Sequence, residues 1–452
     1  MRSSASWLLA MATGISAASS TLHAETFTLA DALGVAYETN PQLDAARAGL
    51  RATDENVALA DSNFRPSLGA SGSYGYQKIP PIFGFGSSEI SHPLTGQLQV
   101  TQSIFNFSNF AVLGKAKEQV KVGRAQLVST EETVLLNAVT AYMNVVRDEA
   151  TLKLRESNVA VLEKQRDATQ EQFRVGELTK TDVSQSLARL AGAQAQLIAA
   201  QGQLGISRAN FEHTIGRPAE TLEVEPLLPS LPKEEDGALG EAHKYNPSLD
   251  AARYNVKVAN FAVQQAIGAL LPQLSVNGTY QYSQNNPNFG QVAVHELTVL
   301  GNVTVLIYQG GAEDATVRQA KEQRGQAELV VADTERQVVD ATRSAWDAYQ
   351  SAAATIASTQ AQVDANKVAF QGVKLEQQVG SRTIIEVLNA EQELFDSEVS
   401  LVAAKRDTAV AAYQLLSAMG TLTAEHLSLH VHVYDPVAHY DDDAGRWVGF
   451  GD

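Results

Sequence analysis

The chain has 452 residues, no cysteine and a formal net charge of −17 at pH 7. The lack of cysteine excludes disulfide bonds, thiolate metal sites, a cysteine nucleophile and the lipid-modified N-terminus of a bacterial lipoprotein. The acidic balance argues against a nucleic-acid partner, which usually needs a basic face.

Residues 1–24 have the pattern of a secretory signal peptide. Arg2 supplies a positive charge, an apolar run follows from Trp7 to Ile15, and small residues lead to Ala24. The apolar run is too short to cross a bilayer as a helix, and no other stretch of about 20 apolar residues occurs. If the chain crosses a membrane, we expect strands to span it.

The chain is an internal duplication. Residues 32–47 match residues 238–253 without gaps, and later elements continue the match at a nearly constant offset. The predicted organisation is a signal peptide at 1–24, a first repeat at 25–217, a Pro-rich linker at 218–233, a second repeat at 234–420 and an irregular periplasmic tail at 421–452.

Each repeat is expected to begin with a helix. Asn40-Pro41 and Asn246-Pro247 place an N-cap residue before proline at the first helical position. The two helices should run about 22 residues, to Asn63 and Gly268.

A β-hairpin should follow in each repeat, at 64–107 and at 270–308. After Pro66 and Pro272 apolar and small polar residues alternate, and each run has about ten residues, the length that crosses an outer membrane when tilted. The alternative is a pair of soluble hairpins packed on a core. Aromatic residues near the strand ends favour the membrane: Tyr76, Phe105, Tyr282 and Tyr308. The loops at 79–93 and 285–294 would then lie outside the cell.

Four strands from one chain cannot close a barrel. The smallest membrane barrels have about eight strands, and side chains fill their interior. Two chains would therefore give a plugged barrel, whereas three chains would give twelve strands and room for water. The strand count predicts a homotrimer in contact with outer-membrane lipid.

Very long helices are predicted at 108–175 and 310–379, each about 100 Å long. A Val-Gly pair ends each one, and a threonine with a carboxylate three residues later starts a return helix of about 35 residues. The return helices carry heptads with large and small residues, typical of close coiled-coil packing. The large positions are Val183, Leu190, Leu197, Leu204 and Phe211, and Val387, Leu394, Leu401, Thr408 and Leu415. An ordinary soluble coiled coil is the alternative interpretation.

The duplicated Asn-Pro-x-Leu-Asp-Ala-Ala-Arg segment, Tyr308-Gln309-Gly310-Gly311 and the two Val-Gly turns together resemble the TolC family of outer-membrane factors. The resemblance covers nearly all of residues 27–420. It implies an α+β membrane protein in which three chains form a twelve-stranded barrel over an α-helical coiled-coil tunnel. That tunnel docks, through periplasmic adaptor proteins, on inner-membrane pumps.

The resemblance also assigns roles at the periplasmic tip. Asp182 and Arg382 match the pair that holds the closed entrance together, and Gln377 stands where better-known members have a tyrosine. Glu386 and Asn389 match two inward acidic residues that form constriction rings, although only Glu386 is acidic here. A solvated helix end is the alternative. The expected adaptor-docking turns are Val175, Gly176, Thr179, Val379, Gly380 and Thr383.

The C-terminal tail holds a weak candidate for a metal site. His430 and His432 would share one face of a strand, but a solvated tail is the preferred interpretation. The sequence has no phosphate-binding loop, nucleophile elbow or paired catalytic constellation. We therefore expect no cofactor and no enzymatic activity.

These features predict the outer-membrane channel of a tripartite export machine, in a Gram-negative bacterium. The expected partners are a periplasmic adaptor and an inner-membrane ABC or proton-driven transporter. Type I protein secretion is preferred because the Tyr434-Asp435-Pro436 tail and the missing lipid anchor resemble that branch. Multidrug or metal efflux is the alternative, and a soluble periplasmic scaffold is the alternative from another class.

Overall fold

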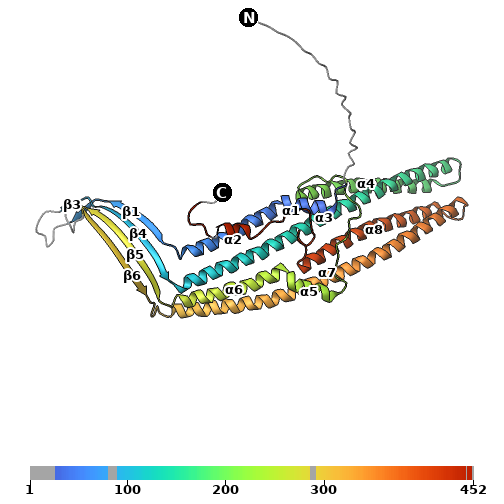
Figure 1. The fold of residues 1–452 in the computed structure, drawn as a ribbon. Coiled ribbons are helices and arrows are strands. Elements are labelled where there is room, and N and C mark those ends of the chain that lie inside the picture. Colours follow the sequence, from blue (N-terminus) through green and yellow to red (C-terminus); the bar gives the residue numbers. More distant parts are fainter. Residues whose placement is uncertain (1–25, 80–88, 286–291, 444, 450–452) are drawn as a thin grey trace, which may run out of the picture.

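The computed structural model describes residues 26–79, 89–285, 292–443 and 445–449. The expected signal peptide and most of the two expected extracellular loops lie outside these residues. The molecule is elongated, with one sheet at one end and long helices over the rest of its length (Figure 1). Within the described ranges, every helix is too short or too polar to cross a membrane.

In its described residues, the first repeat contains four helices and four strands. Their bounds are α1 Leu29–Thr39, α2 Pro41–Ser62, β1 Ser67–Tyr74, β2 Gln77–Ile79, β3 Glu89–Ser91, β4 Leu94–Phe105, α3 Phe107–Arg174 and α4 Lys180–Ile215. The Asn40 side chain accepts a hydrogen bond from the backbone N–H of Gln42, so the predicted N-cap starts α2. The short β2–β3 pair extends the predicted first hairpin beyond its main strands.

The second repeat has the same order of main elements, with no counterpart of the β2–β3 pair in its described residues, and the tail adds a short helix. The bounds are α5 Glu235–Tyr245, α6 Pro247–Gly268, β5 Gln273–Gln284, β6 Val294–Thr304, α7 Ala312–Gln378, α8 Ile384–Met419 and α9 Ala438–Asp443. The long helix α7 begins two residues later than predicted. Gly310 and Gly311 have φ of 69° and 84°, so this glycine pair turns the chain before the helix begins.

The main sheet joins the two repeats. Its strand order is β1-β4-β5-β6, all antiparallel, so the central pair β4–β5 brings one strand from each repeat together. Beyond the sheet, α2 and α4 pack along α3, α8 packs along α7, and α6 packs between α3 and α7 (Figure 1). The prediction that two shorter helices line each long one is confirmed, and α6 in addition joins the two repeats.

The largest core lies midway along the helical part, where the repeats meet. Fully buried side chains of this core include Tyr142, Phe211, Leu415 and Met419. The Tyr142 hydroxyl donates to the Phe27 carbonyl at 2.8 Å and accepts from the Glu223 N–H at 2.9 Å. This hydroxyl therefore holds the start of the first repeat and the irregular linker after α4 on the same core.

The predicted heptad seams are packed, although the large positions Val183, Leu197, Leu394 and Leu401 are only half-buried. In α4 the buried positions include Ser186, Leu190, Ala193, Leu204 and Phe211. In α8 the large and small positions Val387, Ser397, Ala404, Thr408, Ala411 and Leu415 are also buried. The alternation of large and small side chains lets each return helix pack closely against its long partner.

The tail corrects one expectation. It is irregular apart from α9, as predicted, but it does not extend into solvent. Leu422 and Ala424 are buried in the central core, and Tyr440 packs on a second cluster formed by α2 and α3. The tail is therefore part of the folded body.

Candidate functional site: the two faces of the sheet and the helical tip

One face of the sheet is apolar across all four main strands. Residues that pair directly on antiparallel strands project to the same face, so each row of partners reports one face. The apolar rows are Leu68–Val100–Gly278–Val299 and Ala70–Leu98–Tyr280–Leu297. Their large side chains are solvent-exposed in the single chain, because no other element of the described chain covers them. An open apolar face of this extent needs a partner or a lipid phase.

The opposite face is polar. Its rows are Gly69–Gln99–Thr279–Thr298 and Ser71–Gln97–Gln281–Glu296. These side chains carry amide, hydroxyl and carboxylate groups that interact well with water. The period-two pattern of the sequence is therefore preserved across strands, because the register keeps residues of one kind in line.

The outer strands β1 and β6 each have one unpaired edge in the four-stranded sheet. Unpaired N–H and C=O groups along a strand favour pairing with another strand. The sheet thus has the two properties of a barrel segment, two chemically different faces and two open edges.

The far end of the molecule is the tip, where α3 turns into α4 and α7 into α8 (Figure 1). Gly176 and Gly380 have φ of 85° and 81°, which L side chains rarely adopt, and each follows the last turn of its long helix. Val175 and Val379 at these turns are solvent-exposed. Exposed apolar side chains at a turn are available to a partner.

The predicted capping boxes start both return helices. The Thr179 N–H donates to the Asp182 carboxylate at 2.9 Å, and the Thr383 N–H donates to the Glu386 carboxylate at 2.8 Å. The hydroxyl and the N–H of Thr179 hold the pKa of Asp182 below its usual range. Both carboxylates are thus fixed at helix starts, where negative charge is favoured.

Arg382 forms its ion pairs within its own hairpin. Its guanidinium contacts Glu376 at 2.8 Å and Glu386 at 2.8 Å. The Thr383 N–H, followed by the Arg382 guanidinium, lowers the pKa of Glu386 to about 2. Within the described chain Arg382 does not pair with Asp182, so the predicted lock between neighbouring chains stays a prediction.

One hydrogen bond between the two hairpins has no signal in the sequence. The Arg189 guanidinium on α4 donates to the side-chain oxygen of Asn389 on α8 at 2.9 Å. Next to it, Leu388 packs in a buried cluster with Leu162 and Leu190. Asn389 therefore connects the hairpins instead of standing free, and Gln377 lies half-buried beside the second turn.

Two further side chains lie close to this contact. Arg155 on α3 lies over the Phe395 ring of α8, with its Cζ 4.4 Å from the centroid. Glu391 on α8 is buried, and burial raises its pKa to about 7, although the Lys374 ammonium opposes the shift. The tip therefore contains a buried acid that titrates near neutral pH.

The weak metal candidate finds no support. His430 and His432 are both exposed on the tail. Among the residues that the structure describes, no group of three or more His, Cys, Asp or Glu side chains is placed to hold a metal ion.

Comparison with known proteins agrees with this geometry. The sequence profile of the outer membrane efflux protein family matches residues 32–217 and 238–421, one match for each repeat. The outer membrane efflux protein BepC of Brucella suis is 33% identical over 423 residues, which cover 93% of this chain and 91% of BepC. The outer membrane protein TolC of Escherichia coli is 25% identical, covering 86% of this chain and 81% of TolC.

The fold also matches solved structures. A crystal structure of CusC superposes with a TM-score of 0.77 at 15% sequence identity, covering 88% of this chain and 92% of CusC. A two-faced sheet joined to a bundle of long helical hairpins defines a channel-type protein of the bacterial envelope. The chain belongs to the outer membrane efflux protein family, also called the TolC family, and it resides in the outer membrane and extends into the periplasm.

Proposed function

We propose that three copies of this chain form a passive exit duct through the outer membrane. The observation that carries the proposal is the four-stranded sheet, which is apolar on one face, polar on the other and open at both edges. Pairing β6 of one copy with β1 of the next would close twelve strands, with the apolar face toward lipid and the polar face toward water.

The helical hairpins would continue this duct into the periplasm. Each chain supplies two long helices with coiled-coil seams, so three chains supply six hairpins around one axis. The exposed Val175 and Val379 at the hairpin turns would contact a periplasmic adaptor. The adaptor would connect the duct to an inner-membrane ABC or proton-driven transporter, which supplies the energy.

The tip would be the gate of this duct. Within one chain, the Arg189–Asn389 hydrogen bond and the Leu388 cluster hold the two hairpins together. Between chains, Asp182 would approach Arg382, and three Glu386 carboxylates would form a ring at the entrance. Opening would require these weak contacts to exchange for contacts with a partner.

Protein secretion of the type I class is the preferred role. A relative from Pseudomonas aeruginosa, 25% identical over 426 residues, has the name alkaline protease secretion protein AprF. The second candidate is multidrug or metal efflux, because BepC is named an efflux protein. Deletion of the gene distinguishes them: loss of a protein from the medium supports secretion, whereas unchanged secretion with reduced drug or metal tolerance supports efflux.

The oligomeric state is the most direct test of the duct. We expect the protein to need detergent for extraction and to have the mass of three chains in native mass spectrometry. A folded monomer or dimer in mild detergent would contradict the duct, because eight or fewer strands leave no water-filled lumen. The soluble scaffold considered from the sequence is set aside, because the chain belongs to an outer-membrane family.

A further inference from the structure

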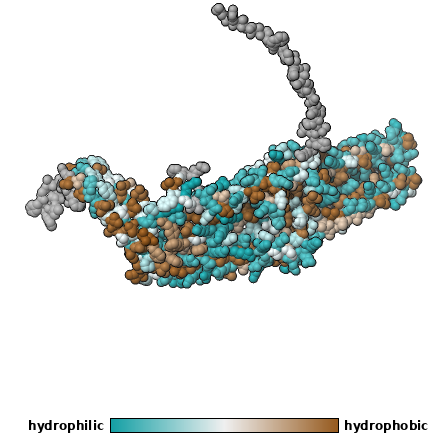
Figure 2. Space-filling view, viewed as in Figure 1, coloured by the Kyte–Doolittle hydropathy of each residue, from teal (hydrophilic) through white to brown (hydrophobic). Residues whose placement is uncertain are grey.

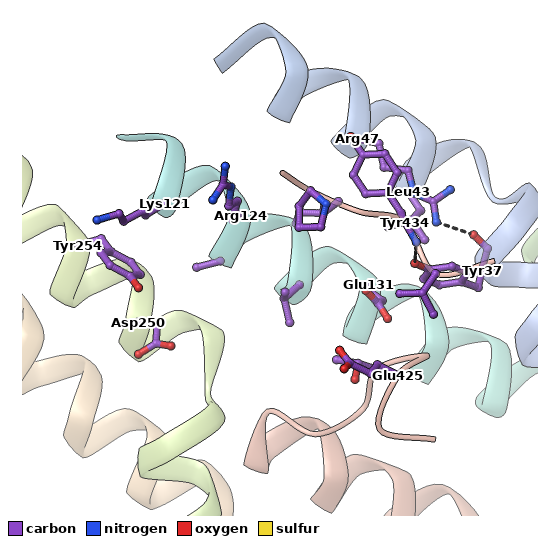
Figure 3. Close-up of a pocket in the computed structure, with 16 residues that line it drawn as sticks. Tyr37, Leu43, Arg47, Lys121, Arg124, Glu131, Asp250, Tyr254, Glu425 and Tyr434 are labelled. Atoms are coloured by element: carbon purple, nitrogen blue, oxygen red, sulfur yellow. Dashed lines mark hydrogen bonds between the residues drawn. The ribbon is translucent and has the colours of Figure 1, made fainter. Parts of the chain in front are cut away.

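The C-terminal tail follows helix α2 over its length. Near the start of the path, the Tyr434 N–H donates to the Tyr37 hydroxyl at 3.0 Å, and the Arg47 guanidinium lies 5.3 Å from the Tyr434 ring (Figure 3). The tail here forms one wall of a cavity of about 430 Å³ whose other walls come from α1, α2, α3 and α6. The Glu131 carboxylate accepts the Ala424 N–H at 2.7 Å and holds the tail at this level.

The next contacts lie farther along α2. His439 Nδ1 lies 3.5 Å from the buried carboxylate of Asp54. The Tyr440 ring packs on the cluster of Val57 and Ala60. The order of the contacts on the tail thus matches the order of their partners along α2. The tail and α2 therefore run in the same direction, toward the sheet.

The path ends at the foot of the sheet. Arg65, which follows α2 and precedes the first strand by one proline, donates to the Arg446 carbonyl at 2.6 Å. The same guanidinium lies 5.0 Å from the ring centroid of Trp447. The tail is therefore fixed beside the point where β1 begins.

The last residues of this path are exposed and apolar. Trp447 is 68% exposed and Val448 is 88% exposed. At this end of the sheet, Leu68, the second residue of β1, is 75% exposed, and Phe110 is exposed with its ring tilted against that of Phe64 at a centroid distance of 4.9 Å. Figure 2 shows hydrophobic side chains gathered where the sheet meets the helices. Trp447 and Val448 are thus held near the start of β1, whose Leu68 belongs to the apolar face of the sheet.

We propose that Arg446, Trp447 and Val448 form a membrane foot that binds the periplasmic phospholipid surface of the outer membrane. Tryptophan is enriched at membrane–water interfaces because its ring is largely apolar while its indole N–H can reach polar groups. The neighbouring Arg446 side chain suits lipid phosphates. If the Trp447 ring stayed in water, its apolar surface would contribute no hydrophobic free energy. At the membrane interface that surface is removed from water, which is favourable.

The proposal rests on the outer-membrane location and not on the cargo or the gate. The acidic run of α9 does not conflict with it, because Tyr440, directly before that run, packs on Val57 and Ala60, about one and a half to two turns of α2 before Arg65. The foot would fix the height of each chain relative to the bilayer. Lipid contact would then begin at the tail and continue onto the strands.

Tryptophan fluorescence can test the foot directly. The chain has three tryptophans, Trp7, Trp346 and Trp447, so Trp346→Phe leaves Trp447 as the only one beyond residue 24. The variant is reconstituted in phosphatidylethanolamine–phosphatidylglycerol vesicles, with and without lipids brominated near the headgroup end of the acyl chains. We expect at least about twofold quenching by the brominated lipid, because an interfacial tryptophan lies within reach of the bromines.

Trp447→Phe is the matched control, because its remaining Trp346 packs against the central core of the helical part. We expect no quenching in that variant. Arg65→Gln, which removes both contacts of Arg65 with the tail end, should reduce quenching of Trp447. Water-like emission of Trp447 without quenching would overturn the proposal in favour of a solvated tail. Blue-shifted emission without quenching would overturn it in favour of cover by a neighbouring chain.

Discussion

Asn389 has a different role from the acidic residue that the family resemblance predicts at its position near the tip. By resemblance it occupies a place expected to carry an inward acid, but here it accepts a hydrogen bond from Arg189 on the other hairpin. A neutral amide avoids repulsion within a ring of symmetry-related groups and still binds a cationic donor. The Arg189–Asn389 hydrogen bond therefore holds the two hairpins of one chain together. Arg382, in contrast, forms ion pairs only within its own hairpin.

Arg189→Ala should loosen the tip. Loss of a partly exposed hydrogen bond of about 1 kcal/mol per chain shifts an opening equilibrium about fivefold. We expect more frequent or larger openings in single-channel recordings, with trimer thermal stability unchanged. Arg208→Ala is the control, because Arg208 also lies on α4 but pairs with Glu149 within its own hairpin. Equal conductance in both variants and the parent would place the lock elsewhere, and Asp182→Ala and Arg382→Ser would then be compared.

Glu386 should make the pore cation-selective over an unusually wide pH range. Its pKa of about 2 lies below the ordinary value of 4.5, so the carboxylate keeps its charge until the pH falls through about 2. Reversal potentials in a salt gradient should show cation preference at pH 7 and at pH 4, and Glu386→Gln should lower it equally at both. A contribution of Glu386 that disappears at pH 4 would contradict this prediction.

The return helices show what heptads can and cannot predict. The seam of α4 against α3 and of α8 against α7 follows from residues spaced within one helix, and the sequence predicts it correctly. Glu391 is not one of the predicted large seam positions, yet it is buried. It lies one helical turn after Leu388, which packs with Leu162 of α3. A third helix adds a second interface that the period of a two-helix coiled coil does not encode.

Because Glu391 is buried, we expect the stability of the folded protein to depend on pH. Burial raises the pKa of Glu391 to about 7, so folding disfavours its ionised form. The stability penalty is absent below about pH 4.5, grows as the pH rises toward 7 and persists above it. Glu391→Gln should therefore raise the melting temperature by a few degrees at pH 8 and change it little at pH 5.

Glu393→Gln is the control for this effect, because Glu393 is exposed on the same helix. We expect its melting temperature to follow the parent at both pH values. A gain from Glu391→Gln that is the same at pH 5 and pH 8 would indicate better packing and not the removal of a buried charge.

For the molecule as a whole, the sequence predicts the repeat, the element order and the two faces of the sheet. Those features depend on local signals: N-caps such as Asn40, turn glycines such as Gly380, and alternation along a strand. The path of the tail could not be predicted, because it depends on contacts such as Arg65 with Arg446 between residues far apart in sequence and without periodicity. The strand order β1-β4-β5-β6 likewise depends on how the repeats meet.

The two faces of the sheet give the strongest test of the assembled duct, because adjacent residues of one strand make opposite predictions. Val299 lies at the middle of β6 on the apolar face, and Thr298 precedes it on the polar face. A lysine on the lipid face near the bilayer midplane costs about 2–4 kcal/mol, whereas a lysine on the lumen face remains in water. In the proposed trimer, the cost of the lysine on the lipid face would arise in all three chains.

Val299→Lys should therefore reduce the amount of folded trimer recovered from the outer membrane. Thr298→Lys should leave trimer recovery near the parental level and lower the cation preference of the pore, because it adds three positive charges to the water-filled lumen. The two substitutions add the same side chain one position apart, so general effects of lysine on strand propensity are matched. If both variants assemble equally well, the apolar face does not contact lipid. If Val299→Lys alone alters ion selectivity, the two faces have been assigned in reverse, and the polar rows would then have to face another protein.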